Sequence, residues 1–216
     1  MKIETMRRAI GTLALYSFAV LFLGCSAAGF QTGGYVAQGR QALFAGNYQI
    51  ALGYFQSADE TDPSYVFSNE LREGVLSYLG RAQYLTGKYE QARQTLERSL
   101  SEHQGNSLTR LYLGMTLARL GDRKEGLMQI EAGLNGIIHF LNYITEAFRF
   151  SFGQYWDTPP QIRNACRKTL ATIEAGNIDW PMLIANGESI AMKMEQEPDQ
   201  AKLAQERAIF QGQFGP

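Results

Sequence analysis

The sequence predicts an all-α protein, a solenoid of stacked helical hairpins that ends in additional C-terminal capping helices. Between Glu73 and Gln104, apolar and small residues recur at spacings of three and four, which is typical of two short amphipathic helices. A turn at Thr86-Gly87-Lys88 separates the two. The same pattern recurs on both sides of this stretch, and no segment shows the alternation of a β-strand. These two observations together predict the fold class.

Length and composition limit the function classes. The 216 residues are enough for one domain, and 45% of them are hydrophobic. The net charge of −1 argues against general nucleic-acid binding, which needs a basic face to neutralise phosphates. Only Cys25 and Cys166 are present, so a framework of disulfides is not the source of stability.

The N-terminal segment has the layout of a secretory signal. Residues 1–8 carry three basic side chains and one acid, and Ala9 to Leu23 is a run of fifteen residues without a charge. A membrane-spanning helix needs about 20 apolar residues, so a permanent span is disfavoured.

The end of this run, Leu21-Phe22-Leu23-Gly24-Cys25-Ser26, resembles a bacterial lipoprotein signal. The resemblance implies that residues 1–24 are removed and that Cys25 is lipidated as the first residue. In such lipoproteins, an Asp directly after the cysteine retains the protein in the inner membrane. This chain has Ser26 at that position, so the resemblance also implies an outer-membrane protein that faces the periplasm. Residues 25–34 are small and Gly-rich and are interpreted as a flexible, lipid-anchored tether.

Glycines recur at matching places in three units. The period between the second and third units is 34 residues, and the first unit carries a seven-residue surplus, residues 64–70. The repeated positions are Gly39, Gly80 and Gly114; Gly46, Gly87 and Gly121; Ala51, Ala92 and Gly126; and Phe55, Leu96 and Ile130. Small residues at the first and third positions allow two helices to approach closely, and a glycine at the second position ends the first helix. Asp122 to Glu125 has the pattern of a capping box for the following helix.

A period of 34 residues with two helices in each unit resembles the tetratricopeptide repeat (TPR) family, over residues 35–136. In this family the first helices line a concave face that binds partners. The resemblance therefore implies exposed partner-binding side chains beside the repeated glycines. They are Arg40, Tyr78, Arg81, Tyr84, Tyr112, Met115 and Arg119. The alternative is that the tyrosines pack inside the protein and the arginines are merely solvated.

Residues 137–210 are interpreted as a helical capping region. The segment from Leu134 to Trp156 is apolar nearly all round and is expected to close the solenoid, with an oligomer interface or the wall of an apolar ligand cavity as alternatives. Three further helices are expected, the first from Thr158 to about Ala175. The second runs from Asp179 to about Glu195, and the third begins at Pro198.

No pattern of residues indicates catalysis. His103 and His139 lack the spacing of metal ligands, and His139 and Cys166 fall in helical patterns typical of a core. The acids Glu195, Glu197 and Asp199 flank Pro198 and are interpreted as solvated caps. The sequence therefore predicts neither an enzyme nor a cofactor or metal site.

The predicted function is that of a scaffold or adaptor of the bacterial cell envelope. It is held to the membrane by lipidated Cys25 and binds an envelope protein through the concave face of its TPR-like repeats. The alternative is an oligomeric solute- or lipid-binding lipoprotein associated with a periplasmic transport system, in which Phe140 to Trp156 line a cavity or a subunit interface.

Overall fold

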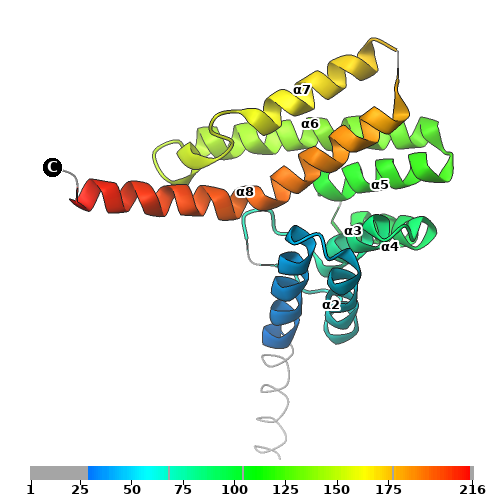
Figure 1. Cartoon of the computed structure of the whole chain (residues 1–216), viewed down its shortest axis with the longest axis horizontal. Helices are drawn as coiled ribbons and strands as arrows, with labels where there is room; N and C mark the ends of the chain where they lie inside the picture. The colour runs from blue at the N-terminus through cyan, green and yellow to red at the C-terminus, as the bar shows by residue number, and fades with distance from the viewer. Residues whose placement is uncertain (1–28, 68, 104, 177, 215–216) are drawn as a thin grey trace, which may run out of the picture.

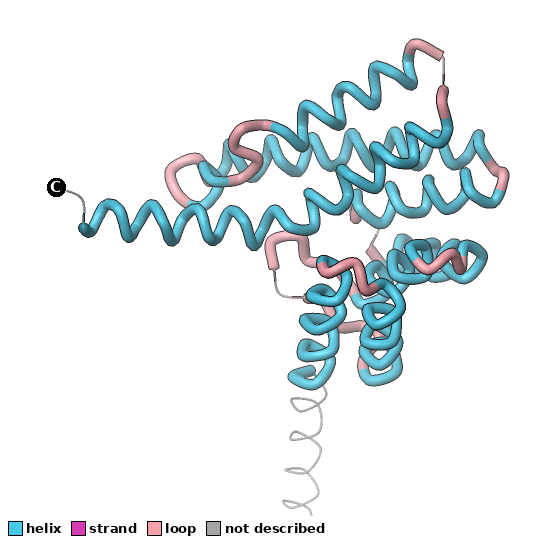
Figure 2. Tube along the Cα trace, in the orientation of Figure 1, coloured by secondary structure: helices cyan, strands magenta, loops and turns pink. Residues whose placement is uncertain are grey.

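The computed structural model describes residues 29–67, 69–103, 105–176 and 178–214. These residues form helices joined by loops, apart from an isolated bridge between Val66 and Gly74, so the predicted all-α fold is confirmed (Figures 1 and 2). The signal peptide and Cys25 lie outside the described residues. The helical elements are residues 29–44, α2 (Tyr48–Thr61), α3 (Val75–Leu85), α4 (Tyr89–Glu102), α5 (Ser107–Leu120), α6 (Arg123–Ala147), the short 3₁₀ helix η1 (Phe152–Tyr155), α7 (Gln161–Glu174) and α8 (Trp180–Phe214).

The helices pack as successive neighbours along the chain. Residues 29–44 and α2 share one apolar cluster, and α3, α4, α5 and α6 each pack against the helix that follows or precedes them. In Figure 1, α8 passes between the pair formed by residues 29–44 and α2 on one side and α6 and α7 on the other. This arrangement is that of a helical-hairpin stack with added C-terminal helices; membership of the TPR family stays a prediction.

The repeated glycines lie where the two helices of each unit approach most closely. A Cβ atom added at Gly39 would lie 2.5 Å from the Phe55 ring, and one added at Gly80 would lie 2.5 Å from the Leu96 side chain. At Gly114 it would lie 2.6 Å from backbone atoms of α6. The predicted close approach is therefore confirmed in all three units.

The second set of glycines ends the first helix of each unit in a left-handed conformation. The φ angles are +75° at Gly46, +77° at Gly87 and +99° at Gly121, a region that residues with a Cβ adopt at a cost. The predicted cap of the next helix is also present, because the Asp122 side chain accepts a hydrogen bond from the Glu125 N–H at 3.2 Å.

Part of the predicted tether is helical. Residues 29–34 belong to the first helical segment, whereas the sequence pattern had indicated a flexible link. Thr32 is fully buried, and the Tyr65 hydroxyl would lie 2.7 Å from a Cβ at Gly33. Packing against the loop that follows α2 therefore stabilises helix in a stretch whose composition alone disfavours it.

The aromatic segment does not form one helix, and its role as a cap of the solenoid stays a prediction. Helix α6 ends at Ala147, so the predicted boundary at residue 136 falls within it, and a loop and η1 follow. Trp156 is buried and its ring meets that of Phe140 edge-on, with ring centroids 5.8 Å apart. Tyr143 and Phe150 are exposed.

The predicted break in the last helix is wrong, because α8 continues through Pro198. Proline has no N–H to donate to the carbonyl of Met194, and the helix changes direction along its length (Figure 1). The next carbonyl, that of Glu195, accepts a hydrogen bond from Arg40 Nη2 at 3.2 Å. A side chain from the first helical segment therefore supports α8 where proline weakens its backbone hydrogen bonding.

Within the residues that the structure describes, no helix combines the length and the apolar character that crossing a membrane requires.

Candidate functional site

The predicted partner-binding side chains gather on one face, and α8 covers that face. Six of the seven are buried: Arg40, Tyr78, Arg81, Tyr84, Tyr112 and Met115. Only Arg119 keeps a large exposed fraction, 42% of its side chain. The expectation that these residues are exposed is therefore wrong for six of them, while their role in binding a partner stays a prediction.

The residue that follows the repeated glycine meets α8 in every unit. In unit one, Arg40 Nε donates to Glu195 Oε1 at 2.8 Å. In unit two, Arg81 Nη1 donates to the other oxygen of the same carboxylate. In unit three, Met115 packs against Gly187, where an added Cβ would lie 2.7 Å from its Sδ. The side chains that follow the repeated glycines thus form a surface that binds a helix, and that helix, α8, belongs to the same chain.

Charged side chains form a buried network at the centre of this contact. Arg81 pairs with Glu73 as well as with Glu195, and Arg40 pairs with Glu195 and, at 2.9 Å, with Asp199. Glu73, Arg81 and Glu195 are each about 1% exposed. Burying such charges costs several kcal/mol per ion, so they are tolerated because two arginines face two carboxylates in the interior.

Aromatic rings complete the surroundings of the two arginines. The Arg81 guanidinium carbon lies 4.8 Å from the centre of the Tyr78 ring and 5.6 Å from that of Tyr112. Burial, followed by the charge of Glu195, raises the pKa of Tyr78. Burial likewise raises the pKa of Tyr112, although the positive charge of Arg81 opposes the shift. Both phenols are therefore neutral in the folded protein at physiological pH.

A second polar contact joins the repeats to α8 one step nearer its N-terminus. The Tyr84 hydroxyl donates to Glu188 Oε1 at 2.6 Å, and Arg119 Nη2 lies 3.7 Å from the same oxygen. Burial, followed by the hydrogen bond to Glu188, raises the pKa of Tyr84. The structure thus brings the seven predicted residues together, because each of them contacts α8 directly or contacts another of the seven.

The sequence interpretation missed the α8 side of this contact. Glu195 and Glu197 were interpreted as solvated caps, but their exposed fractions are 1% and 8%. Only Asp199 is exposed as predicted, with 57% of its side chain accessible. The available signal was the spacing of Glu188 and Glu195, which are seven residues apart and therefore share a helix face.

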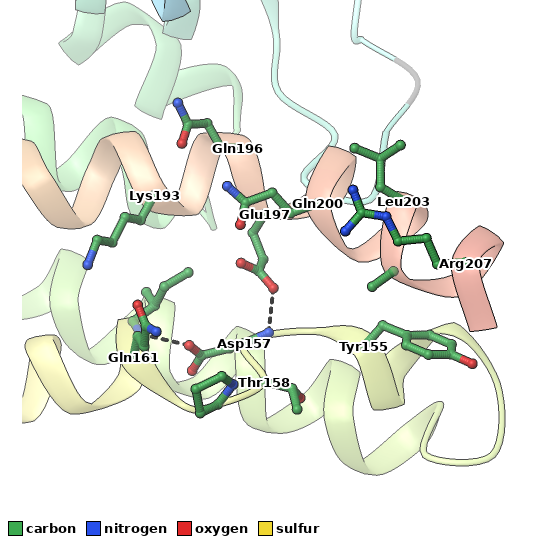
Figure 3. Close-up of a pocket in the computed structure, with 13 residues that line it drawn as sticks. Tyr155, Asp157, Thr158, Gln161, Lys193, Gln196, Glu197, Gln200, Leu203 and Arg207 are labelled. Atoms are coloured by element: carbon green, nitrogen blue, oxygen red, sulfur yellow. Dashed lines mark hydrogen bonds between the residues drawn. The ribbon is translucent and has the colours of Figure 1, made fainter. Parts of the chain in front are cut away.

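A groove of about 530 Å³, here named the α8 groove, lies between α8 and the segment that joins η1 to α7 (Figure 3). Its volume falls within the usual range of ligand sites. The residues that line it are Tyr155, Asp157, Thr158, Pro159, Gln161, Ile162, Lys193, Gln196, Glu197, Gln200, Leu203, Ala204 and Arg207.

The two carboxylates of the α8 groove are already engaged. Asp157 accepts hydrogen bonds from the backbone N–H groups of Ile162 and Arg163 at 2.7 and 3.1 Å, and from Arg163 Nε at 2.9 Å. It therefore caps the N-terminus of α7, from a backbone position with φ of +46° that ordinary residues rarely adopt. Glu197 accepts a hydrogen bond from the Asp157 N–H (Figure 3), and burial raises the pKa of Glu197.

The remaining polar groups of the α8 groove are available for a ligand. Among the described residues, Lys193 and Arg207 form no ion pair, and the side-chain amides of Gln161 and Gln200 form no hydrogen bond. Amides and cations in this arrangement bind and orient polar ligands. The engaged carboxylates provide no obvious acid–base pair.

A second groove, here named the Arg40 groove, lies along another side of α8. Its volume is about 500 Å³, and it is lined by Arg40, Phe67, Asn69, Glu70, Phe152, Trp156, Pro198, Asp199, Ala201, Lys202 and Gln205. Two members of the predicted aromatic segment, Phe152 and Trp156, thus reach a groove, although most of that segment packs into the core.

The thiol and the histidines show no sign of chemistry. Cys166 is buried, as predicted, and burial raises its pKa to about 12, which keeps it protonated at neutral pH. His103 and His139 are both exposed, so the prediction that His139 lies in the core is wrong. In the described part of the chain, no group of three or more His, Cys, Asp or Glu side chains is arranged to hold a metal ion.

Compared with protein-family models, curated proteins and solved structures, the chain matches none of them.

Proposed function

We propose that the protein is a lipid-anchored, non-catalytic adaptor of the bacterial envelope that binds a partner protein. Two features support this proposal. The sequence around Cys25 resembles a lipoprotein signal, and the folded part is a stack of helical hairpins, a scaffold that many systems use for protein binding. The partner is an envelope protein, and the membrane contact is the lipid on Cys25.

The partner does not take the place of α8 on the concave face. The first half of α8 buries Leu183, Ile184, Ile190 and Met194 in the main apolar cluster. At 1.5–3 kcal/mol for each large side chain, removing them from the core would cost about 6–12 kcal/mol. That range is comparable to the whole free energy of unfolding of a typical domain. The concave face is therefore part of the fold, and the partner binds elsewhere.

The exposure of large apolar side chains on the second half of α8 is the observation that carries the proposal. The C-terminal end of the helix extends past the other helices (Figure 1). Leu203, Ile209 and Phe210 on this half are 52%, 52% and 64% exposed. Large apolar side chains gathered on one exposed segment mark an interaction surface. The helical repeats would hold this segment in place, and the segment would contact the partner.

Crosslinking in cells, followed by mass spectrometry, tests the adaptor proposal. We expect the full-length chain to capture a defined envelope protein, and Ile209→Glu to abolish the capture. Ile50→Glu is the matched control, because Ile50 is an isoleucine of similar exposure, 56%, on α2, away from the extended half of α8. Capture that is equally strong in Ile209→Glu would refute the proposed surface. Crosslinks between copies of the chain alone, with an oligomer in light scattering, would favour the oligomeric alternative.

A further inference from the structure

We propose that the α8 groove binds an extended, acidic segment of the partner protein, with two carboxylates spaced about six residues apart. This inference rests on the adaptor function proposed above and adds to it the chemistry of the bound segment. It is carried by Lys193, Gln200 and Arg207 on α8 and by Gln161 on the facing side of the groove (Figure 3).

The spacing of the three α8 residues places them on one helix face. Lys193, Gln200 and Arg207 are each seven residues apart, which corresponds to two helical turns. At 1.5 Å per residue, the Cα atoms of Lys193 and Arg207 are about 21 Å apart along the helix if the change of direction at Pro198 is neglected. The groove is therefore a strip with a positive charge near each end and an amide between them.

The acidic residues of this half of α8 do not cancel those charges. Asp199 points to the other side of the helix, where it pairs with Arg40. The buried Glu197 carboxylate accepts the Asp157 N–H, and Asp157 itself pairs with Arg163. Lys193 and Glu197 are four residues apart yet form no ion pair. Glu206, next to Arg207 in the sequence, is exposed but does not line the α8 groove. The unpaired charges among the residues that line the groove are therefore positive.

We assign an extended peptide to the α8 groove, because a short extended segment matches the spacing of Lys193 and Arg207. An extended chain rises about 3.3 Å per residue, so about six residues span 21 Å. Carboxylates at both ends of such a segment would reach Lys193 and Arg207. The free amides of Gln161 and Gln200 can bond to its backbone N–H and C=O groups.

Selection from a phage library of random 12-residue peptides tests this inference, with the full-length chain in detergent micelles as the target. We expect the selected peptides to share two acidic residues about six positions apart. In fluorescence anisotropy, the double variant Lys193→Ala/Arg207→Ala should bind the selected peptide about tenfold more weakly. The control Lys168→Ala/Lys202→Ala removes the same charge outside the α8 groove and should change the affinity less than twofold.

Two results would overturn the inference: selected peptides without acidic residues, or equal weakening in both double variants. The second result would show that net charge alone attracts the peptide. The adaptor proposal fails separately, when the wild-type chain captures no partner in cells. Capture that survives Lys193→Ala/Arg207→Ala but is lost in Ile209→Glu would leave the adaptor in place and remove the acidic segment.

Discussion

Replacing Glu195 by glutamine tests whether the buried network holds α8 on the repeats. The carboxylate of Glu195 accepts hydrogen bonds from both Arg40 and Arg81, and Glu195 is 1% exposed. Glutamine has nearly the same shape but no charge, so two buried arginines would face one buried carboxylate, that of Glu73. Removing one member of a buried ion pair costs 3–5 kcal/mol, because an uncompensated charge remains in the interior.

The lower end of that range applies to Glu195→Gln. Arg81 keeps its pairing with Glu73, and Arg40 keeps its pairing with the exposed Asp199. We therefore expect the free energy of unfolding to fall by about 3 kcal/mol. For a chain of this size, such a loss lowers Tm by about 6–12 °C. Urea unfolding of the full-length chain, followed by circular dichroism, measures the change.

Asp199→Asn is the matched control for Glu195→Gln, because it removes one carboxylate charge from the same network. Because Asp199 is exposed, we expect the loss of its ion pair with Arg40 to lower the free energy of unfolding by less than about 1 kcal/mol. A change below 1 kcal/mol for Glu195→Gln, or equal losses for both variants, would contradict the proposed role of the network. An unchanged slope of free energy against urea would show that both variants unfold from equally compact states.

Further predictions concern the repeats, the α8 groove and the anchor. Gly114→Ala should lower the free energy of unfolding in the same urea assay by about 1–3 kcal/mol, because the new Cβ would lie 2.6 Å from backbone atoms of α6. The control Gly53→Ala should be neutral or stabilising, because no atom lies within 4 Å of a Cβ added there. Because burial raises the pKa of Glu197, its protonated form stabilises the fold below the pKa of the unfolded chain, and this stability is lost as the pH rises through the folded pKa. Glu197→Gln should therefore be more stable than the wild type at pH 7, with a difference that shrinks as the pH falls through the folded pKa and is lost below about pH 4; a pH-independent difference would contradict this reasoning. Cys25→Ser should leave the chain uncleaved or soluble, and continued detergent partitioning after signal removal would rule out the lipid anchor.

The repeat units could be predicted from the sequence because their constraints are local. Each repeated glycine faces a residue sixteen positions later in the same unit, as with Gly80 and Leu96. The turn glycines, such as Gly87, are set by the backbone conformation at one residue. Constraints of this kind act within one helical hairpin and leave a periodic trace in the sequence.

The contents of the concave face could not be predicted in the same way. Arg40 and Glu195 are 155 residues apart, and no local pattern couples them. The local sequence pattern around an arginine beside a repeated glycine is the same whether the side chain faces solvent, a partner or another part of the chain. The helical state of residues 29–34 escaped prediction for the same reason, since it depends on packing against Tyr65.

The position of Arg40 links the proposed anchor to the proposed partner-binding segment. Arg40 lies on the helical segment of residues 29–44, and the first described residue of this segment is four positions after Cys25. Its guanidinium and Nε contact the side chain and carbonyl of Glu195 before Pro198 and the side chain of Asp199 after it. One side chain thus bridges the site where α8 changes direction. The helical segment on the side of the proposed anchor, together with the bend of α8 that Arg40 holds, would fix the direction in which the exposed half of α8 points away from the other helices. In the proposed adaptor, Arg40 would supply the connection that presents a partner at a set orientation to the membrane.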